Sequence, residues 1–181
     1  MIDRQKLIIR CGGGSAVAEF LQRDGDCWKT VASGEAFIGR NGTGKTAEGD
    51  MKTPLGVFGV RQAFGIRPNP GTSLPYLRIT DSIYACDCEG QWYNTIVDTA
   101  VSGVPCGGEY MVEMKPEYDY GLELDYNADN VYPAGSAIFV HCKGAKPYTA
   151  GCVALDAGMM KRILKEADAG MRVEISDETQ V

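Results

Sequence analysis

A single histidine and a cysteine eleven residues after it are the side chains in this sequence best suited to chemistry. His141 stands at the end of an apolar run, and Cys152 directly follows Gly151. A free thiol, with a pKa of about 8.5, is a weak nucleophile, but an adjacent imidazole can take its proton and activate it. Gly144 and Pro147 lie between the two residues, so the chain can fold back and bring them together. The pair predicts cysteine-dependent acyl transfer.

The residues around Cys152 favour the same chemistry. Gly151 lets the backbone approach a substrate closely, and the amides of Gly151 and Cys152 could stabilise the oxyanion of an acyl-transfer intermediate. A helix is predicted to begin after Asp156, and we expect its N-terminus to favour the Cys152 thiolate by a few tenths to about 1 kcal/mol. The alternative is structural: a satisfied core histidine at His141 and a buried thiol at Cys152, since free cysteine is among the most buried residue types.

Zinc binding is a second alternative for the cysteines. Soft ligands are present at Cys86, Cys88 and Cys106 and in the adjacent pair His141 and Cys142. Structural zinc sites prefer ligand pairs separated by two to four residues, and neither a C-x-C nor an adjacent His-Cys pair matches that spacing well. We therefore expect no metal site.

The seven cysteines cannot all pair within one chain, so either three disulfides and one thiol or seven thiols are possible. A core of this size needs no disulfides, and we expect most of the six cysteines other than Cys152 to be reduced. Cys86 and Cys88, about 6.5–7 Å apart along a strand, should not bridge each other. Cys142 follows His141 on a strand and should point away from Cys152, without pairing with it.

The stretch Gly39 to Thr46 matches the phosphate-binding pattern G-x-x-x-x-G-K-[ST] and raises the possibility of an ATP- or GTP-dependent enzyme. That motif requires a helix directly after it. Gly49, Pro54 and Gly56 follow within ten residues of Thr46, and they disfavour a helix by about 1 kcal/mol for each glycine and about 3 for the proline. We expect a turn-rich loop here and no nucleotide site.

The elements that must position His141 and Cys152 are mostly short strands. Apolar or β-branched runs recur between turn signals every 8 to 12 residues or so, which is typical of a β-rich sandwich or barrel-like domain. The runs cover residues 7–9, 16–21, 28–31, 36–38, 57–60, 79, 83–86, 93–97, 122–126 and 137–141.

The pattern changes to a helix after Asp156, which is a suitable N-cap. Gly170 is the expected stop, and residues 172–175 alternate as a half-buried strand would. Four apolar residues fall on one helical face: Met160, Ile163, Leu164 and Ala167.

Composition excludes several classes of protein. The 181 residues carry a net charge of −6 with lysine and arginine scattered, so nucleic acid is not an expected partner. No apolar run approaches the 18 or so residues of a membrane span. The longest apolar run before Arg10 is Leu7 to Ile9, so no signal peptide is visible.

Several of these segments together resemble the L,D-transpeptidase catalytic domain, the YkuD-like family. Thr149-Ala-Gly-Cys-Val153 is similar to its nucleophile segment in the subfamily with T-x-G-C, and His141 to its base. Residues 39–58, with Glu48-Gly-Asp50, are similar to the family's G-x-x-G…EGD-x-KTP-x-G-x-F signature. The resemblance covers about residues 7–176 and implies one catalytic domain over 1–181.

The sequence departs from the family pattern at three positions beside the site. Ala150 replaces a second histidine, Cys142 replaces a glycine, and Ala154 replaces an arginine found in many members. An arginine could have bound a substrate carboxylate in a bidentate manner, so these departures concern substrate recognition rather than base or nucleophile.

The resemblance implies a mainly β fold, with a helix after the catalytic cysteine, and an acyltransferase acting on peptidoglycan stem peptides. Cys152 would attack the carbonyl that links an L-centre to a terminal D-amino acid, with His141 as base and with Gly151 and Thr149 at the oxyanion or substrate. No metal or organic cofactor is implied. Cell-wall biogenesis, cell shape and an extracytoplasmic location follow from the substrate. An L,D-carboxypeptidase using water, and a non-catalytic peptidoglycan-binding module, are the alternatives.

Overall fold

The computed structural model describes residues 4–12 and 15–178. Its strands are β1 (Gln5–Gly12), β2 (Ser15–Asp24), β3 (Cys27–Ala36), β4 (Gly56–Gly65), β5 (Tyr76–Arg78), β6 (Ile83–Cys86), β7 (Thr95–Asp98), β8 (Gly108–Tyr110), β9 (Gly121–Leu124), β10 (Phe139–Cys142), β11 (Val153–Leu155) and β12 (Arg172–Asp177). The helices are α1 (Thr99–Ser102), α2 (Ala157–Glu166) and the short 3-10 helices η1 (Met111–Glu113) and η2 (Glu117–Asp119). The expected mainly β fold is confirmed.

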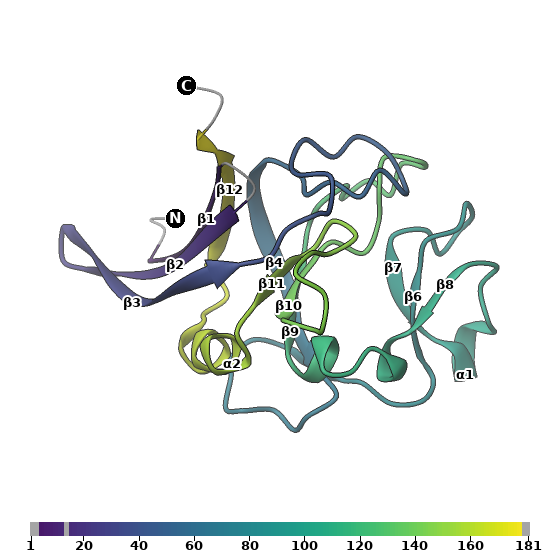
Figure 1. Ribbon diagram of the computed structural model, residues 1–181. Coiled ribbons are helices and arrows are strands. Elements are labelled where there is room, and N and C mark those ends of the chain that lie inside the picture. The colour runs from purple at the N-terminus through teal and green to yellow at the C-terminus, as the bar shows by residue number, and fades with distance from the viewer. Residues whose placement is uncertain (1–3, 13–14, 179–181) are drawn as a thin grey trace.

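The larger sheet is nearly closed and barrel-like, and its strand order is β11-β10-β9-β4-β12-β1-β2-β3, with β5 paired to β4 (Figure 1). Strand β12 lies between β1, to which it is parallel, and β4, to which it is antiparallel. Strands β10 and β11 are also parallel neighbours. The β1–β12 pair joins residues far apart in the sequence, so local alternation of residue types could not predict it.

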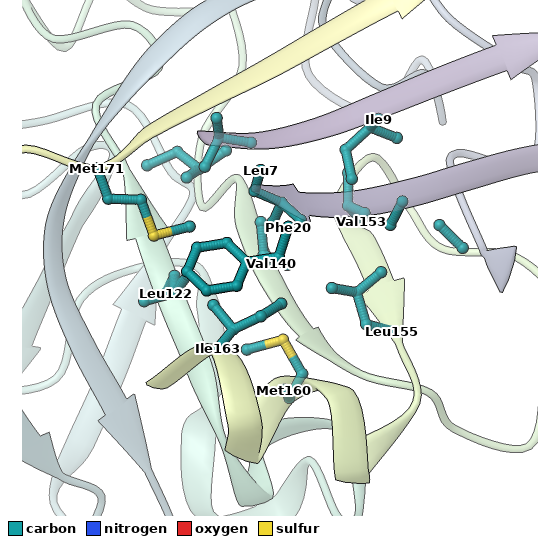
Figure 2. Close-up of a cluster of buried hydrophobic side chains, with 14 of the residues drawn as sticks. Leu7, Ile9, Phe20, Leu122, Val140, Val153, Leu155, Met160, Ile163 and Met171 are labelled. Carbon is teal, nitrogen blue, oxygen red and sulfur yellow. The ribbon is translucent and has the colours of Figure 1, made fainter. Parts of the chain in front are cut away.

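The main core lies between this sheet and α2. Met160, Ile163 and Leu164 of α2 are fully buried, as predicted, and they pack with Phe20 and Leu155 from the sheet (Figure 2). Each fully buried aliphatic or aromatic side chain of this kind contributes about 1.5–3 kcal/mol. The strand β11 is therefore held firmly between β10 and the helix.

The start of α2 is as predicted, but its end is not. The Asp156 carboxylate accepts a hydrogen bond from the Gly158 amide. The helix ends at Glu166 rather than near Gly170, because Ala167 takes up an extended backbone conformation. Tertiary contacts hold the chain there, since the Ala167 carbonyl accepts from Ser73 Oγ at 2.9 Å and the Asp168 amide donates to Gln5.

A second, three-stranded sheet of order β7-β6-β8 stands beside the barrel-like sheet (Figure 1). Ile83 and Ala85 of β6 pack with Tyr118 of η2 and Phe139 of β10 in a second hydrophobic cluster that includes Cys152. This small sheet therefore forms one side of the surroundings of Cys152, on the face of β10 opposite the main core.

One disulfide, Cys88–Cys106, ties the loops at the end of this small sheet. Four of the six cysteines other than Cys152 are free thiols: Cys11, Cys27, Cys86 and Cys142. The predictions that Cys86 does not bridge Cys88 and that Cys142 does not pair with Cys152 are confirmed.

The loop after Gly39 contains no helix, as predicted. The Asp50 carboxylate accepts from the amides of Thr46, Ala47 and Lys52 and folds the segment into a compact turn. Across the described chain, no helix has the length and apolar character to cross a membrane. The N-terminal segment that was searched for a signal peptide begins with residues 1–3, which lie outside the described part.

Candidate active site

His141 and Cys152 both line a cavity of about 480 Å³ between the two sheets. His141 is on β10 and lies opposite Ala154 of β11 in the parallel register. Cys152 directly precedes β11 and belongs to the second hydrophobic cluster, on the face of β10 opposite the main core. Cys142 points the other way, into the main core, where its thiol contacts the Tyr120 carbonyl. The His141 and Cys152 side chains therefore reach the same cavity, and their roles as base and nucleophile stay predictions.

The Cys152 sulfur has two backbone partners. It accepts a hydrogen bond from the Phe139 amide at 3.3 Å and donates one to the Ala137 carbonyl at 3.2 Å. Burial raises the pKa of the Cys152 thiol to about 12, although the Phe139 amide acts in the opposite direction. Cys152 at rest is therefore a protonated thiol whose sulfur already faces a hydrogen-bond donor suited to an anion.

His141 is held in one orientation by its own neighbour. Its Nδ1 lies 2.8 Å from the carbonyl oxygen of Cys142, so Nδ1 carries the proton and Nε2 is left as the basic nitrogen. Burial lowers the pKa of His141, while the Cys142 carbonyl acts in the opposite direction. The ring also packs edge to face against Tyr118, with centroids 5.5 Å apart. A neutral, oriented imidazole is the form that a general base requires.

Thr149 and Gly151 shape the turn that presents Cys152. Thr149 Oγ1 donates to the Cys152 carbonyl at 2.6 Å and accepts from the Gly151 amide at 3.1 Å. Gly151 has a φ of +152°, and a Cβ there would lie 2.9 Å from the Lys52 carbonyl, so only glycine fits. Because the Gly151 amide already has an acceptor, the expected oxyanion role is left to the Cys152 amide.

The expectation that a helix N-terminus supports the Cys152 thiolate is wrong. Strand β11 separates Cys152 from α2, whose first turn is capped by Asp156. The effect of a helix dipole falls off within its first turn, so α2 does not act on the sulfur. The sequence predicted where α2 starts but not that strand β11 lies before it. The three residues of β11 are too few for a recognisable alternation.

Several residues of the site were not predicted. Thr53, fully buried on the Gly39–Thr53 loop, donates to the Cys152 carbonyl at 3.4 Å. Tyr118 donates to the Glu109 carboxylate, and both line the cavity. Burial raises the pKa of Glu109, and the Tyr118 hydroxyl acts in the opposite direction. These residues come from distant segments, and only the family-like stretch around Thr53 gave a signal in the sequence.

Among the described residues, no group of three or more histidine, cysteine, aspartate or glutamate side chains is arranged to hold a metal ion. Cys88 and Cys106, two of the candidate zinc ligands, form the disulfide. The charges that line the cavity are of both signs: Lys45, Glu48, Asp87, Glu109, Glu117 and Lys146. The arrangement can therefore bind a small zwitterionic group beside a thiol and an imidazole.

Comparison with known proteins identifies the fold and the family. The chain matches no curated protein sequence. It is similar to the helical cell shape determining protein Pgp2 from Campylobacter jejuni, with 14% identity and a TM-score of 0.52 over 97% of this chain and 49% of that one. It is also similar to Bd1075 from Bdellovibrio bacteriovorus, with 15% identity and a TM-score of 0.51 over 96% and 48%. The chain spans about half the length of these structures, and at such identities they show the fold alone.

The family match covers most of the chain. Residues 16–175 match the sequence model of YkuD, described as the L,D-transpeptidase catalytic domain. The matched range includes every residue of the cavity described above. The chain therefore belongs to the YkuD family of L,D-transpeptidase catalytic domains.

Proposed function

We propose that this chain is a cysteine acyltransferase that remodels peptidoglycan stem peptides as an L,D-transpeptidase, with residues 1–181 as one catalytic domain. The observation that carries the proposal is that His141, on β10, and Cys152, just before β11, line the same cavity of about 480 Å³. Family membership supports the peptidoglycan substrate. The mixed charges of the cavity suit a peptide end that carries both amine and carboxylate.

The proposed reaction begins with two neutral groups. His141 Nε2 takes the Cys152 proton as the sulfur attacks the carbonyl carbon before the terminal D-amino acid, and the Cys152 amide faces the oxyanion. The carbon–nitrogen bond then breaks, the D-amino acid leaves with the proton from His141, and a thioester remains on Cys152. An amine from a second stem attacks the thioester and gives its proton to His141. The released sulfur takes that proton back, which restores the site.

Location and biological role are part of the same proposal. Peptidoglycan lies outside the cytoplasm, and the Cys88–Cys106 disulfide fits an oxidising compartment. The fold similarity to Pgp2, which is described as a cell shape determining protein, supports a role in cell shape through wall remodelling.

Product analysis tests this function. The protein is incubated with a tetrapeptide stem, with and without an acceptor amine, and the products are identified by mass. We expect release of the terminal D-amino acid and an acceptor-dependent cross-linked product. A shortened stem that forms at the same rate with and without acceptor would instead identify an L,D-carboxypeptidase. No turnover of the stem by the folded protein would identify a binding module.

His141→Ala is the matched variant for this assay. Positioned general-base catalysis contributes about 10²- to 10⁴-fold, so the rate should fall by that factor while the melting temperature changes little. A variant that loses its fold, with a normal rate in the remaining folded fraction, would show that His141 is structural.

A further inference from the structure

Lys45 is a buried lysine that the reaction above does not use. Its side chain is 3% exposed and lines the same cavity as Cys152. The ammonium donates to Asp50 Oδ1 at 3.0 Å and to the Ala47 carbonyl at 3.2 Å. An ammonium has three hydrogens, so these two acceptors leave one for a group in the cavity. Lysine is almost never buried to this extent without a specific partner.

Two glycines make room for the Lys45 side chain on the way to the nucleophile. At Gly135, with a φ of +113°, a Cβ would lie 2.4 Å from Lys45 Cε. At Gly151, a Cβ would lie 3.6 Å from Lys45 Nζ. The stem of the lysine therefore crosses Gly135, and its ammonium ends beside the residue that directly precedes Cys152.

The stability of the loop does not explain why the Lys45 ammonium is placed beside Asp50. Asp50 already accepts three backbone amides, from Thr46, Ala47 and Lys52, so the turn has its own hydrogen bonds without the lysine. What Asp50 adds is a fixed position for the Lys45 ammonium. The anchored charge acts on Cys152: burial raises the pKa of that thiol, the Phe139 amide and Lys45 oppose the rise, and Glu109 adds to it.

We propose that Lys45 is a positioning residue of the acyl-transfer site: its ammonium, held by Asp50, is the fixed positive charge that stabilises the anionic sulfur of Cys152 as its proton passes to His141. The role of Lys45 in catalysis rests on the proposed function. Its effect on the ionisation of the Cys152 thiol does not. Lys45 thereby supplies the positive charge that the sequence led us to expect from the N-terminus of α2. A buried charge close to the sulfur is screened by water far less than a surface lysine.

The test is the rate at which iodoacetamide alkylates Cys152, measured from pH 6 to 10 and read from the mass of the Cys152 peptide so that exposed Cys27 does not contribute. The variants are Lys45→Met, Lys45→Arg and, as a matched control, Lys6→Met, which removes a lysine paired with Glu174 on the far strands β1 and β12. We expect Lys45→Met to slow alkylation about 3- to 10-fold at every pH in this range, a shift of the thiol pKa by up to one unit. Lys45→Arg should restore most of the rate, and Lys6→Met should match the unmodified protein.

The melting temperature of each variant reports the fold. Lys45→Met leaves Asp50 without its cation. A second variant, Lys45→Met with Asp50→Asn, therefore removes both charges. Its alkylation rate is the test if the single variant unfolds. Unchanged alkylation of Cys152 in a folded Lys45→Met or double variant would overturn the inference, as would equal slowing by Lys6→Met. Alkylation needs no peptidoglycan, so a protein that fails to turn over stems but shows Lys45-dependent alkylation would sink the proposed function and leave this inference standing.

Discussion

At the scale of single residues, the two central groups of the site, the Cys152 thiol and the His141 imidazole, are both uncharged at rest. Burial raises the pKa of Cys152 to about 12 and lowers the pKa of His141 below its ordinary 6.5, so an ion pair between them is disfavoured before substrate binds. In the proposed reaction, proton transfer and attack on the carbonyl therefore occur together. The Phe139 amide and the Lys45 ammonium are placed to meet the negative charge only when it forms.

The pH dependence of kcat/KM follows from this neutral pair. Activity requires uncharged His141, and because burial lowers its pKa, the imidazole stays uncharged until the pH falls below 6.5. We therefore expect the acid limb of the profile to have its midpoint below pH 6.5. Stopped-time assays of D-amino acid release between pH 4 and 8 would measure it. A midpoint above pH 6.5 would mean that His141 is stabilised in its charged form, against this account.

The thiol of Cys152 could be named from the sequence because nucleophile and base stand in a short, family-like segment. The groups around this thiol could not be predicted from the sequence, because only tertiary folding brings them to the cavity. They are the Phe139 amide, Tyr118, Glu109 and Lys45. Lys45 appeared in the sequence only within a phosphate-loop pattern. The structure turns that lysine toward Asp50 and the cavity.

At the scale of elements, the loop from Gly39 to Thr53 is a scaffold for the active site. Thr53 holds the Cys152 carbonyl, and Asp50 holds the turn. Burial alone would raise the pKa of Asp50, but the amides of Thr46, Lys52 and Ala47 and the Lys45 ammonium outweigh it and lower that pKa to about 2.

Asp50 should therefore contribute measurably to stability. A carboxyl whose pKa is lower in the folded than in the unfolded chain stabilises the fold above its unfolded value and loses that contribution as the pH falls from 4 to 2. We expect Asp50→Asn to lower the free energy of unfolding by about 2 kcal/mol at pH 7, and by much less at pH 2. Urea unfolding at both pH values measures this. Asp24→Asn, at an exposed pair with Lys29, is the control and should cost under about 0.5 kcal/mol. Equal losses in the two variants would contradict the assignment.

The helix and strands show where local sequence is sufficient. The periodicity of Met160, Ile163 and Leu164 predicted the buried face of α2, since that signal is local. The end of α2 depends on contacts of residues 167 and 168 with Ser73 and Gln5, which no local pattern contains. The parallel pairing of β10 with β11 is likewise absent from the local alternation of residue types.

At the scale of the whole molecule, two sheets of different size enclose the cavity between them. The barrel-like sheet supplies His141 on β10 and closes around the core with α2, whereas the small sheet supplies Ala85 and Glu109 to the cavity wall. The Cys88–Cys106 disulfide closes a loop of the small sheet, and a loop of that length is typically worth about 3 kcal/mol.

The thiol count follows from the same arrangement. With one disulfide and five free cysteines, titration of the denatured protein without reductant should give five thiols, and seven after reduction. In the native protein only Cys27 is exposed, so one thiol should react rapidly. Titration with a chromogenic disulfide reagent gives both numbers. Seven thiols before reduction, or only one, would contradict the pairing described here.

The central claim, that Cys152 carries the acyl group, is tested most directly by the intact mass of the protein after incubation with a tetrapeptide stem or a carbapenem. We expect the mass to increase by one acyl adduct that maps to the Cys152 peptide after digestion. Cys152→Ser should remain folded and show no adduct, because a hydroxyl has a far higher pKa than a thiol and His141 Nδ1 contacts a backbone carbonyl rather than a carboxylate. An adduct on another residue, an adduct that persists in Cys152→Ser, or no adduct on the folded unmodified protein with either reagent would contradict the account.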